Sequence, residues 1–139
     1  MDTSGDSVIL YPSCAQVLEM NKQLIDLKGG VYSPPFNLRT PGSVDLILDI
    51  IQEEIFNIEM YPGLYKKVAI LIWKIIVGHV FLDGNKRTGM MAGLFMMAIN
   101  GRPVKATQDE VVEIALRIAT HRETGFTEND LEQWLRQHS

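Results

Sequence analysis

Residue types that can do chemistry are concentrated in one short segment, 79–89, which lies between two strongly apolar stretches. They are His79, Asp83, Gly84, Asn85, Lys86 and Arg87. An imidazole can move a proton near neutral pH, and a carboxylate can hold a hard cation such as Mg²⁺. A glycine lets backbone N–H groups approach an anion, and cationic side chains bind phosphate oxygens. This composition is typical of a phosphate site.

Two predicted helices position the segment. Pro62 and Gly63 precede the apolar stretch 64–77 and Gly78 follows it, where a left-handed cap is easily accommodated, so we predict a buried helix there. A second helix is predicted to open at Asn85 and to stop at Asn100. Unpaired N–H groups at a helix N-terminus favour anions. Two cations in that first turn oppose the helix dipole unless an anion is bound, which favours a binding site.

Each residue also has a purely structural interpretation. His79 could be a capping or packing residue and Asp83 a simple N-cap, while Phe81 is best explained as an aromatic that plugs into the core. A single N-cap does not require two adjacent cations, however. The cluster as a whole therefore favours function.

The pattern His79-x-Phe81-x-Asp83-Gly84-Asn85-Lys86-Arg87-Thr88 resembles the signature loop of the Fic/Doc family, and its lysine resembles the Doc (death-on-curing) toxin group. Members that transfer AMP carry a glycine where this chain has Lys86, and a further arginine where it has Met90. The resemblance extends over roughly residues 10–137.

The resemblance implies a role for each residue of the loop. His79 would be the general base, Asp83 would hold Mg²⁺, and Gly84 with Asn85 would form an anion hole, the asparagine donating from its side chain. Arg87 would clamp phosphate bidentately, and Lys86 would act as a point charge.

The resemblance also implies the reaction and the partners. The ATP γ-phosphate would pass to a threonine or serine hydroxyl of a target protein, elongation factor Tu, and block translation. A small antitoxin would hold the toxin inactive by docking a helix in a groove.

Two alternatives stay open. The first is AMP transfer to a protein hydroxyl. The second is a non-catalytic module that binds a nucleotide or a partner, since Val77 stands where some Doc proteins have a basic residue near the motif histidine, and Met91 where they can have asparagine.

Period-two alternation over 55–60 predicts a short strand or hairpin, whose docking residues would be Ile55, Phe56, Asn57 and Ile58. By resemblance, this flap would border the active site and pair with an extended target segment. The alternative is a tail of the preceding helix.

Residues 124–129 fit a pattern by which some Fic proteins inhibit themselves, but the arginine that would pair with Glu128 is absent. We favour a capping box between Thr127 and Asp130.

We expect an all-α fold: a single Fic/Doc-type domain over residues 1–139, a bundle of about six helices with a short β-flap, and a flexible extension at 1–10. Predicted helices follow Ser13, Pro41-Gly42 and Thr107 and start near Leu64, Asn85 and Thr127. The methionines of the helix that opens at Asn85 are predicted to fill the core, or else to line a groove for a partner helix.

Composition narrows the function further. A net charge of −4 argues against nucleic-acid binding, and Cys14, the single cysteine, rules out an intrachain disulfide. His121 and His138 lack neighbours that would complete a metal site. The apolar run 68–80 is too short to span a membrane, and residues 1–7 do not resemble a signal peptide. We therefore expect a cytoplasmic protein.

Overall fold

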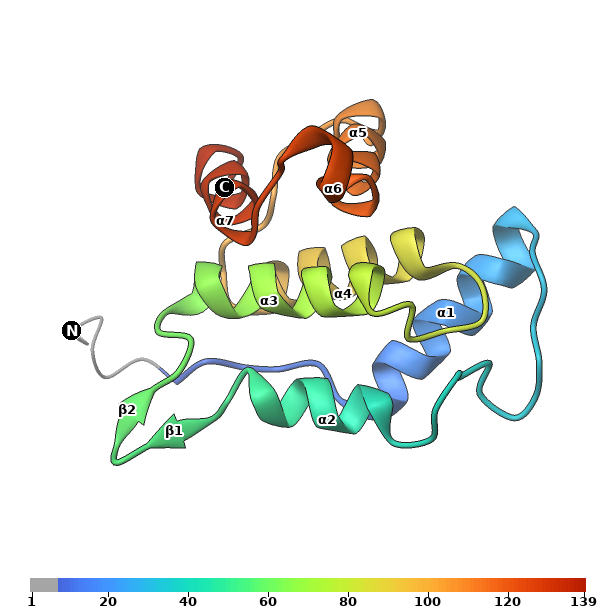
Figure 1. The fold of residues 1–139 in the computed structure, drawn as a ribbon, viewed down its shortest axis with the longest axis horizontal. Helices are drawn as coiled ribbons and strands as arrows, with labels where there is room; N and C mark the ends of the chain where they lie inside the picture. The colour runs from blue at the N-terminus through green and yellow to red at the C-terminus, as the bar shows by residue number, and fades with distance from the viewer. Residues whose placement is uncertain (1–7) are drawn as a thin grey trace.

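The computed structural model describes residues 8–139 as three layers of helices with one small hairpin (Figure 1). The elements are α1 (Cys14–Lys28), α2 (Ser43–Ile50), β1 (Glu54–Ile55), β2 (Ile58–Glu59), α3 (Leu64–Val77), α4 (Asn85–Ile99), α5 (Gln108–Ala119), α6 (His121–Thr124) and α7 (Glu128–Gln137). The central layer is α3 and α4. One side is covered by α1 and α2, and the other by α5 to α7. The predicted all-α class is confirmed, with seven helices in the described part of the chain rather than about six.

The additional helix, α6, is a single turn between α5 and α7. It ends at Gly125, whose φ of 73° is the left-handed conformation that glycine adopts most easily. Such a short turn has no apolar periodicity of its own, which is why the sequence pattern does not reveal it.

Three helices begin with a capping box, each at a position where a helix start was predicted. In each helix, the side-chain hydroxyl of the N-cap residue accepts a hydrogen bond from the backbone N–H of the third helical residue. The side chain of that third residue accepts a hydrogen bond from the backbone N–H of the N-cap residue. The pairs are Ser13 with Gln16, Thr107 with Glu110, and Thr127 with Asp130. The last pair confirms the capping interpretation of the segment before α7.

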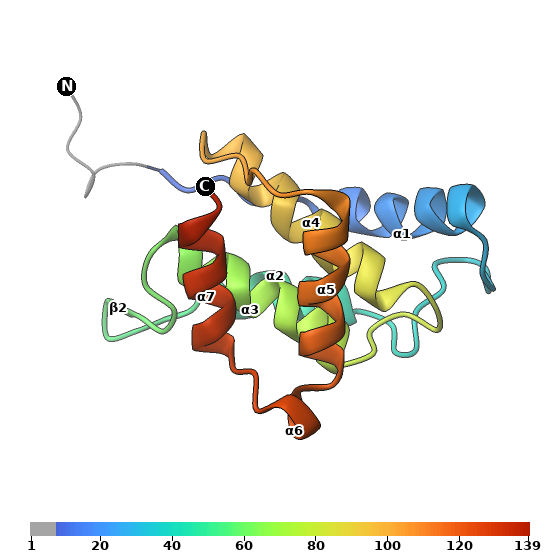
Figure 2. The same cartoon turned by 90° about the horizontal axis from the view of Figure 1, so that it is seen from above.

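The core is centred on α3, whose residues are buried on nearly all sides. α5 and α7 both pack on α3 from one side (Figure 2). α4 approaches α3 closely at two glycines. A Cβ at Gly89 would lie 2.7 Å from Cγ1 of Ile76, and one at Gly93 would overlap Ile72. Glycine at these positions therefore fixes the distance between the two helices.

The methionines of α4 divide between two environments. Met90, Met96 and Met97 are buried, whereas Met91 is 40% exposed. The core interpretation is therefore confirmed for these three methionines, and the partner-helix interpretation stays a prediction for Met91.

The predicted hairpin is present between α2 and α3. Ile55 pairs with Ile58 in antiparallel register, and the turn places Phe56 and Asn57 at positive φ. The ammonium group of Lys67, buried in the first turn of α3, donates to the carbonyl of Tyr61 just after the hairpin over 2.6 Å.

The expected flexible extension falls partly on residues 1–7, which lie outside the described part of the chain. Ile9 and Tyr11 pack against the core, whereas Val8 is 82% exposed. The side chain of Asn100 accepts a hydrogen bond from the N–H of Leu10 over 2.9 Å and donates one to its carbonyl over 2.8 Å. Within residues 8–139, no helix is both long enough and apolar enough to cross a membrane.

Candidate active site

The loop between α3 and α4 gathers all six candidate residues around one depression of about 430 Å³. Its lining includes His79, Asp83, Gly84, Asn85, Lys86 and Arg87. Residues that are near in sequence thus surround one space large enough for a phosphate chain.

The imidazole of His79 is exposed at this depression, and its backbone is left-handed with φ of 47°. We predicted this conformation for Gly78, which is instead right-handed with φ of −76°. Gly78 is required for space, because a Cβ there would overlap the carbonyl oxygen of Lys74. Left-handed backbone costs a non-glycine residue about 1–2 kcal/mol, and such strain is common at functional sites.

Two backbone N–H groups hold the carboxylate of Asp83. Val31 donates to Oδ2 over 2.9 Å, and Gly84 donates to Oδ1 over 2.8 Å. These hydrogen bonds lower the pKa of Asp83 below its usual value, and the nearby charges of Arg87 and Lys86 lower it further. Asp83 is therefore ionised at neutral pH.

Asp83 is suited to share a cation with a nucleotide. No group of three or more potential metal-binding side chains is found among residues 8–139. Mg²⁺ in nucleotide sites needs only one or two carboxylates, since phosphate oxygens and waters complete its coordination. An ionised carboxylate at the edge of a cationic depression fits that requirement.

The side chain of Asn85 closes the loop on itself. Its Oδ1 accepts a hydrogen bond from the N–H of Phe81 over 2.8 Å, and its Nδ2 donates to the carbonyl of Phe81 over 2.9 Å. The resemblance implied side-chain donation to an anion. In this structure the side chain shapes the loop, and the donors that point outward are the backbone N–H groups at the start of α4.

The N-terminus of α4 has the properties of an anion site. Its N-cap, Gly84, is left-handed with φ of 80° and supplies no capping side chain, and the first turn contains no acid. Instead it presents Lys86 and Arg87, both exposed. The backbone N–H groups, the helix dipole and two side-chain charges therefore all favour an anion at one place.

A buried network of hydrogen bonds connects the loop to α1 and to Asn37. This network was not predicted from the sequence. Nδ2 of Asn21 donates to the carbonyl of Asp83 over 3.0 Å and to Oγ1 of Thr88 over 3.1 Å. Asn37 in turn donates to Oδ1 of Asn21 over 3.0 Å. One signal was available: Asn21 interrupts the apolar face that α1 buries, and a polar residue at a core position needs a partner.

The loop segment Val31–Thr40, which turns at residues 34–36, lies along one edge of the site. Leu38 forms an antiparallel bridge with Phe81, and the N–H of Arg39 donates to the carbonyl of Val80 over 3.0 Å. This pairing brings Arg39 into the lining of the depression. No feature of the sequence connected Arg39 with the motif loop, because about 40 residues separate the two.

The hairpin residues Ile55, Phe56, Asn57 and Ile58 are not brought to the site. The hairpin lies at the N-terminal end of α3, whereas the motif loop lies at its C-terminal end (Figure 1). The 14 residues of α3 span about 20 Å at 1.5 Å per residue. The element that borders the depression is Val31–Thr40 instead.

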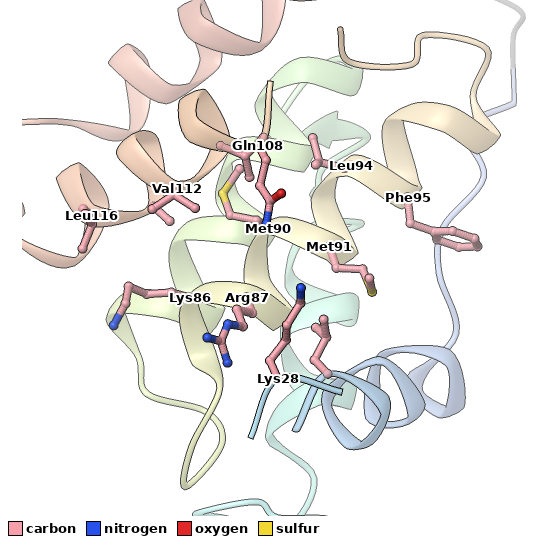
Figure 3. Close-up of a pocket in the computed structure, with 13 residues that line it drawn as sticks. Lys28, Lys86, Arg87, Met90, Met91, Leu94, Phe95, Gln108, Val112 and Leu116 are labelled. Carbon is pink, nitrogen blue, oxygen red and sulfur yellow. The ribbon is translucent and has the colours of Figure 1, made fainter. Parts of the chain in front are cut away.

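An apolar groove of about 670 Å³ lies beside the depression (Figure 3). It runs between α1, α4 and α5, and its apolar lining includes Leu24, Met90, Met91, Leu94, Phe95, Val111, Val112 and Leu116. Lys28, Lys86 and Arg87 supply positive charge along one side, and the last two also line the depression. The groove and the depression therefore share two cations.

Comparison with known proteins agrees with this geometry. A model of the Fic/DOC family matches residues 11–97, which include the motif loop and most of α4. The chain belongs to the Fic/Doc family. It is also 32% identical over 78 residues to Toxin Doc of Mycolicibacterium smegmatis (strain ATCC 700084 / mc(2)155), a match that covers 56% of this chain and 60% of that relative.

Proposed function

We propose that this chain is a Doc-like toxin that transfers the γ-phosphate of ATP to a threonine or serine hydroxyl of a target protein, elongation factor Tu, and so blocks translation. The observation that carries the proposal is the single depression that combines an exposed imidazole, an ionised carboxylate and an uncapped, cationic helix N-terminus. Phosphoryl transfer requires positioning and charge stabilisation, and these groups supply both. The similarity to a protein named Toxin Doc supports the biological role.

The chemistry follows from the residues present. His79, exposed at the depression, takes the proton from the target hydroxyl as the hydroxyl oxygen attacks the γ-phosphorus. The bond between the γ-phosphorus and the oxygen that bridges to the β-phosphate breaks, and ADP leaves. The N–H groups at the start of α4, together with Lys86 and Arg87, hold the phosphate oxygens. Asp83 would hold Mg²⁺, which neutralises charge on the phosphate chain when it is bound.

The target docks along Val31–Thr40 in this proposal. That segment turns at residues 34–36 and pairs with the motif loop through the isolated bridge of Leu38 with Phe81. Val31 and Phe36 in it are 70% and 50% exposed, so the segment offers two apolar side chains to a target. A target strand laid against this segment would bring its hydroxyl close to His79.

The partner that restrains the toxin is an antitoxin whose amphipathic helix docks in the groove between α1, α4 and α5. An apolar face would fit Met91, Leu94 and Val112, and an acidic residue would meet Lys86 and Arg87. Because those cations also line the depression, the bound helix would neutralise the charges that hold phosphate.

Transfer of label from ATP tests the proposed reaction. A bacterial lysate is incubated with the protein, Mg²⁺ and ATP labelled at either the γ- or the α-phosphate. We expect γ-label on a protein band, no α-label, and loss of the label with His79→Ala. Protein-bound α-label would instead establish AMP transfer, and label at neither position would favour a non-catalytic binding module.

A further inference from the structure

Arg39 is a third cation of the depression, and it comes from a different element than Lys86 and Arg87. We propose that the guanidinium of Arg39 binds the phosphate chain of the nucleotide and stabilises its charge during transfer. This inference rests on the proposed function, because it assigns one more residue to the same site.

The backbone of Arg39 is fixed relative to the motif loop, although its side chain is exposed. Its N–H donates to the carbonyl of Val80 over 3.0 Å, and the preceding residue, Leu38, pairs with Phe81. Asn37, one residue earlier, is buried and accepts a hydrogen bond from the N–H of Leu82 at its carbonyl over 2.8 Å. The position of Arg39 at the site therefore follows from the fold.

The guanidinium of Arg39 has no acidic partner within residues 8–139. Two other arginines do have one: Arg117 lies 3.4 Å from Glu113, and Arg136 lies 2.9 Å from Glu132. Of the arginines that have none within the described residues, Arg39 and Arg87 are the two that line the depression. An arginine without an internal partner keeps its five donors for a ligand, and its planar fork matches the oxygens of a phosphate.

The net positive charge of the depression equals the negative charge of a magnesium-bound nucleoside triphosphate only when Arg39 is included in the sum. Three cationic side chains, Arg39, Lys86 and Arg87, line the depression with one carboxylate, Asp83, which leaves a formal excess of two positive charges among these four residues. A nucleoside triphosphate with one Mg²⁺ carries about two negative charges at neutral pH. Without Arg39 the excess would fall to one.

The test compares three variants of the full chain. Arg39→Ala removes the guanidinium, Arg39→Lys keeps the charge but loses the fork, and Arg102→Ala is the matched control. Arg102 follows the C-terminal end of α4, whereas the depression lies at its N-terminal end. Calorimetry measures the Kd for a non-hydrolysable ATP analogue with Mg²⁺, and the γ-label assay measures kcat and KM.

We expect Arg39→Ala to weaken analogue binding or to lower kcat/KM by about tenfold or more, the effect of losing one charge-assisted contact. Arg39→Lys should recover part of the loss, and Arg102→Ala should match the wild type. The melting temperature of Arg39→Ala should stay unchanged, since the hydrogen bond that anchors residue 39 uses its backbone.

Two results would overturn the inference. If the wild type binds the analogue and transfers phosphate while Arg39→Ala does both equally well, Arg39 has no role at the site, and the proposed function survives. If the wild type neither binds the analogue nor transfers phosphate, the proposed function fails and the assignment of Arg39 fails with it.

Discussion

At the scale of single residues, the motif loop carries the reactive groups and other segments hold them in place. Of the two N–H groups that hold the carboxylate of Asp83, one belongs to Gly84 in the loop and the other to Val31, which lies far from the loop in sequence. The main support is Asn21, whose side chain binds the carbonyl of Asp83, Oγ1 of Thr88 and Asn37. Activity should therefore be sensitive to residues that never touch a substrate.

Replacing Asn21 by alanine tests this dependence. The change removes the buried donor to Oγ1 of Thr88 and leaves the carbonyl of Asp83 with only the longer hydrogen bond of 3.4 Å from Nδ2 of Asn37, which costs about 1–3 kcal/mol of unfolding free energy. Urea denaturation should show that loss, and phosphotransfer should fall as the loop loosens. Gln23→Ala, at an exposed position on the same helix, is the control. Equal stability of both variants would contradict the supporting role of Asn21.

Site residues that lie close together in the sequence could be predicted, and those that lie far from the motif loop in the sequence could not. His79, Asp83 and Arg87 could be grouped because their spacing is local. Arg39 and Asn37 reach the site only through pairing with the loop across about 40 residues, which no local pattern encodes. The conformation of Gly78 was wrongly predicted because the steric demand there comes from the carbonyl of Lys74, not from a left-handed backbone.

At the scale of elements, the bounds of the helices could be predicted because caps are local. Ser13, Thr107 and Thr127 mark three N-termini by their own hydrogen bonds. The hairpin could be predicted from its alternation, but its location relative to the site could not. That location depends on the direction in which α3 leaves it, which is a tertiary property.

The contact between α3 and α4 gives an element-scale prediction. Gly93→Ala should destabilise the protein by about 1–3 kcal/mol, because the new methyl group overlaps the buried Ile72. An exposed helix would instead gain about 1 kcal/mol from the same change. Thermal unfolding of Gly93→Ala, Ile72→Ala and the double variant forms a cycle. The double variant should be more stable than the sum of the single effects, and a stabilising Gly93→Ala would show that the helices can separate freely.

The groove between α1, α4 and α5 gives a second prediction at this scale. Leu94→Asp places a charge in its apolar lining and should abolish copurification with the proposed antitoxin, while the variant keeps the proposed phosphotransfer activity. Leu46→Asp, at a position that is 59% exposed on α2, is the matched control and should still bind the antitoxin. The groove would be excluded as the docking site if the antitoxin bound both variants equally.

At the scale of the whole molecule, the three layers place a polar depression and an apolar groove on either side of one helix N-terminus. Lys86 and Arg87 line both. A partner that fills the groove can therefore act on the site through shared charge, without a change in the fold. The resemblance of the motif to the Fic/Doc family implied an antitoxin partner. That Lys86 and Arg87 line both the groove and the depression became visible only in the structure, which places α1 and α5 beside α4.

Transfer of a γ-phosphate at the depression would change the mass of the target protein by one phosphoryl group, so the intact mass of the target distinguishes the possible reactions. Elongation factor Tu is incubated with the protein, ATP and Mg²⁺, alongside a His79→Ala control. We predict a gain of about 80 Da, one phosphoryl group, that is absent in the control. A gain of about 329 Da would mean that AMP is transferred instead. An unchanged mass, for this factor and for every other protein in a lysate, would contradict the account.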